Sequence, residues 1–363
     1  MWSMVNSMQI ILTYDFLNLP RPGNVIMVMT NLADLCSMAV LPTDDIMSFL
    51  FNFTPTDVPG VGFEAMGSDN KSLCLYLGMA FLIMLFIWFQ YLLYALSYCC
   101  RHYDNLMNKI EEKLRPGLVY GVLYLFLIET YLDWAIGSAL RIEEPKYETP
   151  SDYFDLGLAC IGIMITLVLP FHCFFFLRKN VNYLDEDEFK SRHGALYEGL
   201  MVDDEFKQQA TRKMMPWFLV RRFLTAVNII YLRNHTIWIQ LTVNMYLSLY
   251  DTAFKFSYGH YENRVGGFME KFNDLFVITC SYFLYLFTDL TQSQEEQYLI
   301  GWVYSGVVGI LIISNLFVVI MTALKDLKEK IQSMIDNCKH QKEVEEQKKR
   351  RELQKEVMLK VKS

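Results

Sequence analysis

The sequence predicts an all-α membrane protein, a polytopic helix bundle with a charged helical tail at its C-terminus. Of its 363 residues, 53% are hydrophobic and 15% aromatic, whereas only 20% are charged. Soluble domains usually carry fewer apolar and more charged residues. The apolar residues are grouped in blocks of about 20 residues, the length that an α-helix needs to cross a bilayer. The charged residues gather between these blocks and after residue 325.

Seven segments are apolar enough to predict strong membrane spans, and two weaker segments precede them. The strong spans are expected at 73–98, 116–140, 155–178, 216–233, 236–256, 273–290 and 299–324. The weaker segments, 4–19 and 25–42, flank "LPRPGN", a sequence typical of a turn. Asp15 and Asp34 make insertion of these segments more costly. For 1–42, a pair of spans, a re-entrant hairpin and two interfacial helices therefore remain open.

The distribution of basic residues predicts how the bundle is oriented. Cytoplasmic loops carry an excess of Lys and Arg, which places 99–115 and the loop 179–215 inside. The acid-rich segments 141–154 and 291–298 are placed outside, as is the 43–72 loop. The tail 326–363 is rich in Lys and Arg, so the bundle 73–325 is expected to end in a cytoplasmic C-terminus, most simply at the plasma membrane.

Three glycosylation sequons agree with this orientation. Their acceptors are Asn52, Asn70 and Asn234, and each falls on a segment that the charge rule places outside. We therefore regard these three asparagines as candidate glycosylation sites, although Asn234 lies close to the membrane.

Two adjacent arginines, Arg221 and Arg222, stand at the start of the 216–233 segment in "FLVRRFLTAVNIIYL". A voltage sensor needs basic residues at every third position of one helix, and the next basic residue here is Arg233. Anchoring at the membrane interface is the simplest interpretation. The alternative, which would give the Arg221–Arg222 pair a specific function, is binding of lipid phosphates, because the guanidinium forms bidentate contacts with phosphate.

Polar residues inside the predicted spans are the candidates for a cation pathway, because such residues are costly at membrane depth. The candidates are Glu129, Asp133, Asn244, Asp251 and Asp274. Glu129 and Asp133 are four residues apart and would share one helix face. Hydrogen bonding between helices is the competing interpretation for all of them. The loop between the last two spans is too short for a pore helix with a filter.

Several function classes lack support in the sequence. No nucleophile elbow, phosphate-binding loop, zinc signature or dinucleotide-binding turn is present, so we expect neither an enzyme nor a resident cofactor or metal. The acid clusters at 185–188 and 203–205 could bind calcium, but they lack the spacing of a helix–loop–helix site, and a solvated acidic loop is favoured. No nucleic-acid module is present.

The tail 326–363 is rich in helix-forming residues and is expected to continue the last span as a helix. Leu324, Leu327, Ile331, Met334 with Ile335, and Cys338 form a short apolar stripe along it. A solvated charged helix and a short coiled coil that binds a protein partner or a second copy both remain open.

Several segments together resemble the C-terminal membrane region of large ciliate surface proteins with cysteine-rich repeats. They are "MWSMVNSMQIILTYDFLNLPRPGN", "GFEAMGSDN", "HGALYEGL", "FLVRRFLTAVNIIYL" with "IQLTVNMYLSLY", and "FNDLFVITCSYFLYLFTDL" followed by "GWVYSGVVGILIISN". The resemblance covers nearly all of 1–325 and extends distantly to fungal transient-receptor-potential-like membrane proteins. It implies a multi-span protein of the cell surface. This chain has no cysteine-rich repeats, so it is either a membrane-only member or lacks an N-terminal part.

Together these observations predict a channel-like, cation-permeable protein whose partners are membrane lipids and, through its tail, another protein or a second copy. Two alternatives remain open. The bundle could be a non-transporting anchor or assembly subunit that ties an extracellular structure to the cell, or it could move lipids. Polar residues that converge on one groove would favour transport, whereas polar residues at separate helix contacts would favour the anchor.

Overall fold

The computed structural model describes residues 2–37, 43–54, 63, 71–100, 109, 121–197, 199–291 and 293–362. Within these ranges the secondary structure is helical apart from one isolated antiparallel bridge between Leu200 and Tyr261. The all-α class is therefore confirmed. The chain divides into two compact units, one comprising Trp2–Gly309 and the other beginning at Ile310.

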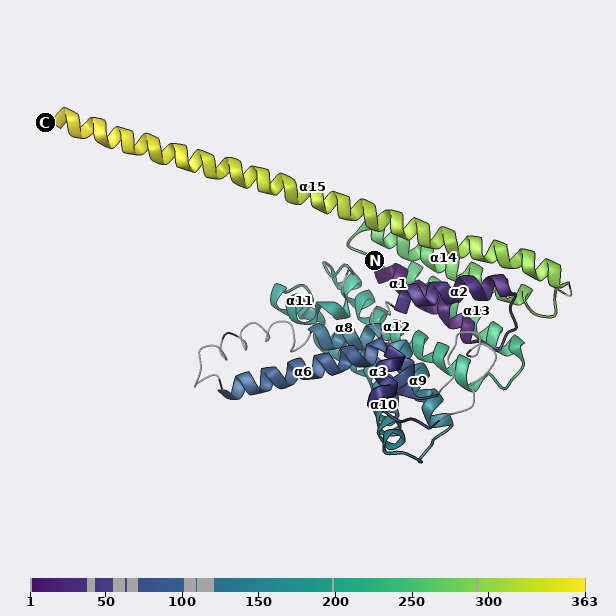
Figure 1. Ribbon diagram of the computed structural model, residues 1–363. Coiled ribbons are helices and arrows are strands. Elements are labelled where there is room, and N and C mark those ends of the chain that lie inside the picture. The colour runs from purple at the N-terminus through teal and green to yellow at the C-terminus, as the bar shows by residue number, and fades with distance from the viewer. Residues whose placement is uncertain are drawn as a thin grey trace. The chain divides into compact units, whose positions relative to one another are not determined.

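The helices follow the chain as labelled in Figure 1. They are α1 (Trp2–Thr13), α2 (Gly23–Ser37), α3 (Thr43–Leu50), α5 (Leu73–Leu77), α6 (Met79–Cys100), α8 (Gly121–Glu129), α9 (Tyr131–Glu143), α10 (Pro150–Lys179), α11 (Asp187–His193), α12 (Glu205–Tyr231), α13 (Ile237–Tyr258), α14 (Arg264–Leu286) and α15 (Gln294–Lys362). Short 3-10 turns occur at Tyr14–Phe16, Val181–Tyr183 and Gly194–Leu196.

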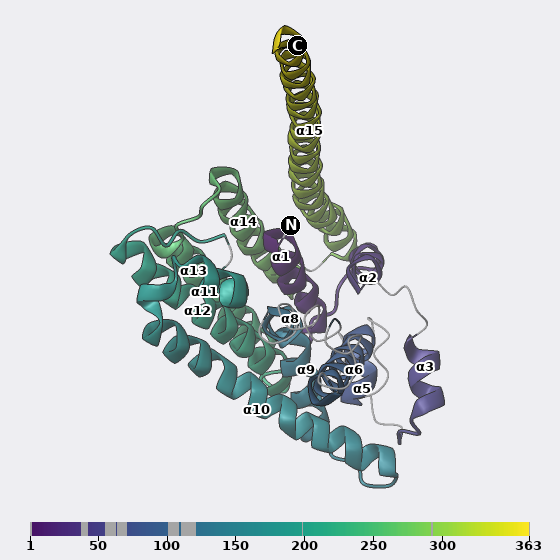
Figure 2. The ribbon, with the colours of Figure 1, turned by 90° about the vertical axis from the view of Figure 1, so that its left-hand side faces the viewer.

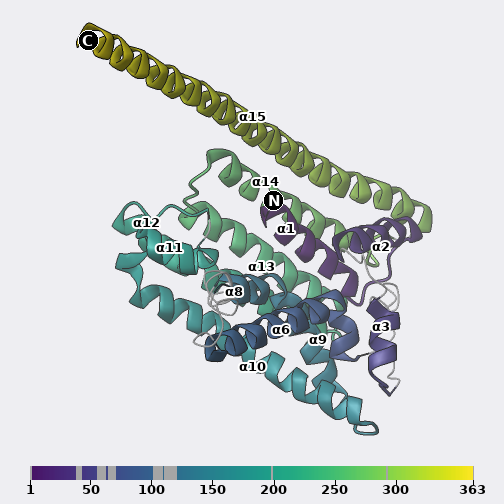
Figure 3. The ribbon, with the colours of Figure 1, turned by 60° about the vertical axis from the view of Figure 1, so that its left-hand side comes forward.

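The core of the first unit is built from α9, α10, α12, α13 and α14. Helix α12 packs against α9, α10 and α13, and α13 packs against α14. Helix α1 lies along α14, as Figures 2 and 3 show from two directions. The N-terminal segment is therefore part of the bundle.

Fewer helices meet the requirements of a membrane span than the sequence predicted. Three described helices are long and apolar enough, namely Met79–Cys99 in α6, Pro150–Lys179 and Gln294–Met334 in α15, and the bent pair α8–α9 would be a fourth. They correspond to four of the seven expected strong spans. The prediction of seven is therefore not supported.

The remaining three expected strong spans fall on α12, α13 and α14. These helices are 27, 22 and 23 residues long, so length is not what distinguishes them. They differ by the polar side chains that interrupt them, which the bundle buries against one another. In 1–42, α1 has 12 residues and the apolar part of α2, Gly23–Ala33, is also shorter than a bilayer requires.

The expected continuous span 116–140 is broken in its described part. Helices α8 and α9 meet at Thr130 with a bend of 59°. Glu129 therefore ends one helix while Asp133 lies in the first turn of the next. The expectation that the two acids share one face of a continuous helix is wrong, because the axis changes direction between them.

The 179–215 segment folds onto the bundle, although a solvated acidic loop was expected there. Leu184, Leu196, Tyr197 and Leu200 are buried in one apolar cluster with residues of α8, α10 and α12. The acidic residues occupy turns and helix starts around this cluster. Asp204, for example, caps α12 by accepting the Lys207 backbone N–H at 2.8 Å.

Two glycines of α10 lead to a first prediction about how α9 and α10 pack. A Cβ at Gly162 would lie 2.1 Å from Ser138 Oγ and 2.9 Å from Trp134, whereas a Cβ at Gly157 meets nothing within 4 Å. Gly162→Ala should lower the free energy of unfolding by about 1–3 kcal/mol through overpacking. The matched Gly157→Ala should be neutral or stabilising by up to about 1 kcal/mol, because alanine favours helix. Denaturant unfolding of the detergent-solubilised protein measures both, and equal effects would contradict the close α9–α10 contact.

Candidate functional site: a buried charge network

Five charged side chains from α12, α13 and α14 converge inside the bundle. The Lys255 ammonium contacts three carboxylates, Asp274 at 2.9 Å, Glu270 at 3.0 Å and Asp251 at 3.2 Å. Arg221 forms an ion pair with the same Asp251, whose other oxygen accepts a 2.9 Å hydrogen bond from Trp217 Nε1. We call these five residues, Arg221, Asp251, Lys255, Glu270 and Asp274, the charge network.

Four of the five residues of the charge network are buried, and Glu270 is partly exposed. Asp251 and Asp274 are each 2% exposed, and Lys255 is 9% exposed. When all five groups are ionised, the three carboxylates exceed the two cations by one negative charge. Within the described part of the chain, Asp274 Oδ2 has no hydrogen-bond partner. Charges buried in this way are costly unless they are paired, so the network holds α12, α13 and α14 in one arrangement.

Arg222 lies outside the charge network and contacts the end of α8, where α8 and α9 meet. Its guanidinium donates to the carbonyl oxygens of Ile128 at 3.2 Å and Glu129 at 3.4 Å, the last two residues of α8. It also donates to Asn6 Oδ1 at 2.8 Å and to Gln9 Oε1, both on α1. The last carbonyls of a helix have no partner within the helix and carry its negative dipole end. Arg222 therefore caps α8 and ties it to α1 and α12.

The two arginines differ from their expected position at the membrane interface. Arg221 is 7% and Arg222 1% exposed, and the terminal guanidinium nitrogens of both donate to protein oxygens. A cavity of about 10 Å³ lies beside them, lined also by Asn6, Ser7 and Lys255 among others. This volume is about that of one water-sized probe. Lipid-phosphate binding by this pair therefore stays a prediction from the sequence.

The five candidates for a cation pathway are only partly brought together. Asp251 and Asp274 belong to the charge network. Asn244 is buried on α13, with its side-chain nitrogen 3.5 Å from Ser281 Oγ on α14. Glu129 is exposed and Asp133 half-buried on either side of the helix break. The structure thus separates an inner group on α13 and α14 from an outer pair near α8 and α9.

A polar clasp joins α12 and α13 near the short turn between them. Asn228 Nδ2 donates to the backbone carbonyl of Gln240, and Gln240 Nε2 donates to the backbone carbonyl of Asn228, both at 3.0 Å. Both residues are buried. The hydrogen bonding between helices that the sequence offered as one interpretation is therefore present here.

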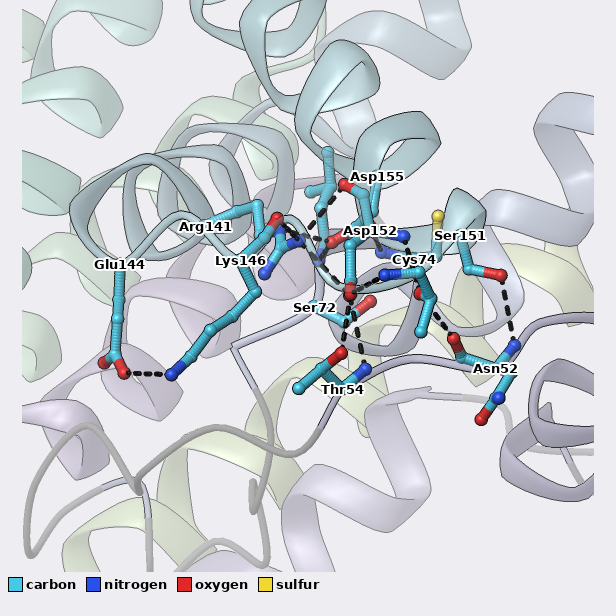
Figure 4. Close-up of polar contacts among 12 residues, drawn as sticks. Asn52, Thr54, Ser72, Cys74, Arg141, Glu144, Lys146, Ser151, Asp152 and Asp155 are labelled. Carbon is cyan, nitrogen blue, oxygen red and sulfur yellow. Dashed lines mark hydrogen bonds and ion pairs between the residues drawn. The ribbon is translucent and has the colours of Figure 1, made fainter.

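A second buried ionic cluster lies between α9 and α10 (Figure 4). Arg141 Nε is 2.9 Å from Asp155, and its Nη2 is 3.5 Å from Asp152 Oδ1. Asp155 accepts the backbone N–H groups of Leu73 at 3.2 Å and Cys74 at 2.9 Å, which begin α5. Arg141 thus pairs with two carboxylates, and the carboxylate of Asp155 accepts from the backbone at the start of α5.

The same cluster fastens the segment around residue 53. Asp152 accepts from the Thr54 hydroxyl at 2.6 Å and from its backbone N–H at 3.2 Å, as Figure 4 shows. The Asn52 backbone contacts Ser151 and Thr149 through hydrogen bonds of 3.1 and 2.8 Å. Among the sequons, Asn52 and Asn234 are exposed, as glycosylation requires, and Asn70 lies outside the described residues.

Glu144, at the edge of this cluster, gives a pH-dependent prediction. A hydrogen bond from the Lys71 ammonium holds the pKa of Glu144 below its ordinary value, with Lys146 contributing and partial burial opposing. A carboxylate whose pKa is lowered on folding contributes stability above its unfolded pKa of about 4.3, and loses it as pH falls through the folded pKa. Between about pH 5 and pH 3, Glu144→Gln should therefore lose less unfolding free energy than the wild type. Lys71→Met should reduce this slope by less than Glu144→Gln does, because Lys146 remains beside the carboxylate. A slope equal to that of the wild type would contradict the Lys71–Glu144 pairing.

The arrangement offers no ready metal site. Within the described ranges, no group of three or more His, Cys, Asp or Glu side chains is placed to hold a metal ion. In the 203–205 acid cluster, Lys207 Nζ lies 2.9 Å from Asp203 and 3.4 Å from Asp204. The ammonium of Lys207 therefore lies where a calcium ion bound by this acid cluster would have to lie.

A groove between α8 and α10 is apolar. It has a volume of about 480 Å³ and is lined by Leu127 of α8 and by residues of α10 from Cys160 to His172. Of its lining residues only His172 is strongly polar, and this side chain hydrogen-bonds to Tyr124 at 2.8 Å. A path for a lipid headgroup needs a continuous polar side, which this groove lacks.

Sequence reasoning missed the two residues that organise these clusters, Lys255 and Arg141. Both lie at ends of predicted spans, where basic residues are usually taken as interfacial anchors. A signal for Lys255 was present, because it stands four residues after Asp251 and so faces it on one helix. The buried pair Arg21–Asp15, which closes the turn between α1 and α2, was missed in the same way.

Comparison with known proteins adds no relative. No protein-family model, no curated protein and no solved structure matches this chain. The resemblance to ciliate surface proteins and to fungal transient-receptor-potential-like proteins stays a prediction from the sequence.

Proposed function

We propose that the chain is an integral membrane protein that conducts cations and that its charge network closes the pathway. The observation that carries the proposal is the convergence of Asp251, Glu270 and Asp274 on the Lys255 ammonium at 2.9–3.2 Å. Rings of carboxylate oxygens select cations in channels. Here the side-chain cations Lys255 and Arg221 occupy the carboxylates, so an ion passes only when these side chains withdraw.

Two further features support a membrane role with moving parts. Ionisable groups buried in membrane bundles are costly, and they mark ion or proton pathways by default. A discontinuous helix such as α8–α9 is typical of transport proteins, where the ends of half-helices meet charged groups. In this proposal the basic 326–363 tail lies on the cytoplasmic side, most simply of the plasma membrane.

Cation flux into proteoliposomes tests the proposal. The purified chain should carry a K⁺ flux that rises in Lys255→Met, because the carboxylates lose their built-in cation, and falls several-fold in Asp274→Asn. Asp289→Asn, an exposed acid beyond the end of α14, is the matched control and should behave as the wild type. Glu129→Gln with Asp133→Asn tests the outer pair separately.

Two results would overturn the proposal. One is a folded wild type that stays silent across voltage, calcium and membrane tension, with Lys255→Met equally silent. The other is a flux that Asp274→Asn and Asp289→Asn change equally, which would place the pathway elsewhere.

A second candidate function is a non-transporting membrane anchor or assembly subunit. It is favoured by the small volume of the cavity beside the charge network, about 10 Å³. In that case the buried pairs serve only to fix helix contacts. A silent proteoliposome assay would move this candidate ahead.

A further inference from the structure

Helix α15 carries a continuous row of exposed apolar side chains along one face. Its first half consists of Ile310, Ile313, Phe317 and Ile320, and its second half of Leu324, Leu327, Ile331 and Met334. Each of these side chains is 44–68% exposed. We call this row the heptad stripe. Figure 1 shows that its residues belong to one uninterrupted helix, Gln294–Lys362.

The spacing along the heptad stripe alternates strictly between three and four residues. That is the a/d pattern of a coiled coil, here with Ile310 at an a position and Met334 at a d position. An apolar period of 3.5 residues keeps such a stripe facing a neighbouring helix in a left-handed supercoil. The pattern is maintained over eight successive positions, which is more than the tail alone suggested.

In its second half, from Leu324 to Met334, the stripe is not covered by lipid. Between Leu324 and Met334 every residue off the stripe is polar or charged. These residues are Lys325, Asp326, Lys328, Glu329, Lys330, Gln332 and Ser333. A lipid-surrounded helix is apolar on all sides, and a helix packed on a folded core has a wider apolar face than a and d positions alone. A narrow seam on a polar helix requires another helix.

We propose that this other helix is α15 of a second copy, packed parallel and in register along the heptad stripe. Two copies inserted in one membrane with the same topology necessarily present α15 in the same direction and at the same depth. An a/d stripe is complementary to itself under that symmetry. Along the described part of the stripe no like charges oppose each other. The e position Lys328 of one helix faces the g position Ala323 of the other.

Stripe substitutions with charge-matched controls test the interface on the full chain. The mass of the detergent-solubilised protein, from light scattering at tens of micromolar, should be a multiple of 42.6 kDa after the detergent contribution is subtracted. Leu327→Glu with Ile331→Glu should reduce it to that of one chain. Gln332→Glu with Ser333→Glu adds the same charge at b and c positions and should leave the mass unchanged. Far-UV circular dichroism confirms that both variants remain helical.

Disulfide trapping distinguishes this interface from other contacts. In a chain whose exposed native cysteines are replaced by serine, Leu327→Cys at a d position should form an intermolecular disulfide in membranes under mild oxidation. Glu329→Cys, at the outward f position, should not. A single-chain wild type, a glutamate stripe variant that keeps the wild-type mass, or equal trapping at 327 and 329 would each overturn the proposal. Failure here leaves the cation-flux test untouched, because that test does not involve α15.

Discussion

Lys255→Met should destabilise the folded protein by about 3–5 kcal/mol, the cost of breaking a buried ion pair by removing one partner. The methionine keeps the length and apolar stem of the side chain but removes the only described cation in contact with Glu270 and Asp274. The buried carboxylates of Asp251 and Asp274 and the partly exposed one of Glu270 then share Arg221 alone, which contacts Asp251. Denaturant unfolding of the detergent-solubilised variant, followed by circular dichroism, measures the loss.

Two further variants test this prediction, one as a control and one as a double variant. Lys271→Met removes a lysine of α14 that lies over the Phe256 ring at 5.0 Å and forms no described ion pair, and it should cost no more than about 1 kcal/mol. Lys255→Met combined with Asp274→Asn should recover part of the loss, because it removes one of the uncompensated charges. Strictly additive effects in the double variant would show that Lys255 and Asp274 are not coupled.

Arg222→Met should have the second large effect, about 2–5 kcal/mol. The substitution leaves the carbonyls of Ile128 and Glu129 without their charged donor at the end of α8. It also releases Asn6, and with it part of the contact between α1 and α12. The same unfolding measurement applies, and proteolysis near Thr130 adds a local readout of the opened helix break.

Arg233→Met is the matched control for this helix. Arg233 lies just beyond the end of α12, and its ion pair with Glu143 at 2.8 Å is partly exposed. Such pairs contribute about 0–1 kcal/mol. Arg222→Lys should recover little, because a lysine cannot reach two carbonyls and two side-chain oxygens from one planar group. Equal losses in Arg222→Met and Arg233→Met would contradict the capping role.

The helical class could be predicted from the sequence, because composition and the length of the apolar blocks determine helix formation without information on distant contacts. The spans at 73–98, 155–178 and 299–324 are recovered as α6, α10 and the first part of α15 for this reason. The last helix also continues through the tail as predicted. Helix-forming composition and a maintained apolar stripe need no tertiary information.

The sequence was insufficient where polar residues depend on partners far along the chain. Asp251 and Asp274 were recognised as costly, but Arg221, which pairs with Asp251, was placed at the membrane interface. Arg221 meets Asp251, and Arg222 meets Asn6, because of the way α1, α12 and α13 cross in the fold. The spacing of residues along the sequence does not predict how helices cross. The break at Thr130 was missed because "FLIETYLDW" contains neither Pro nor Gly, the usual signals of a helix interruption.

Helices α12 and α13 are fastened to each other at two points, by the Asn228–Gln240 clasp near their turn and by Arg221–Asp251 seven residues from Asn228 along α12. A helical hairpin fixed at two points moves as one rigid body. If the bundle opens, the α12–α13 hairpin must therefore move as a whole, either along α9 and α10 or away from α14. The chain leaves this hairpin at Gly259, where an added Cβ would lie 2.4 Å from the Lys255 carbonyl oxygen, so a larger residue there would disturb the connection from α13 to α14.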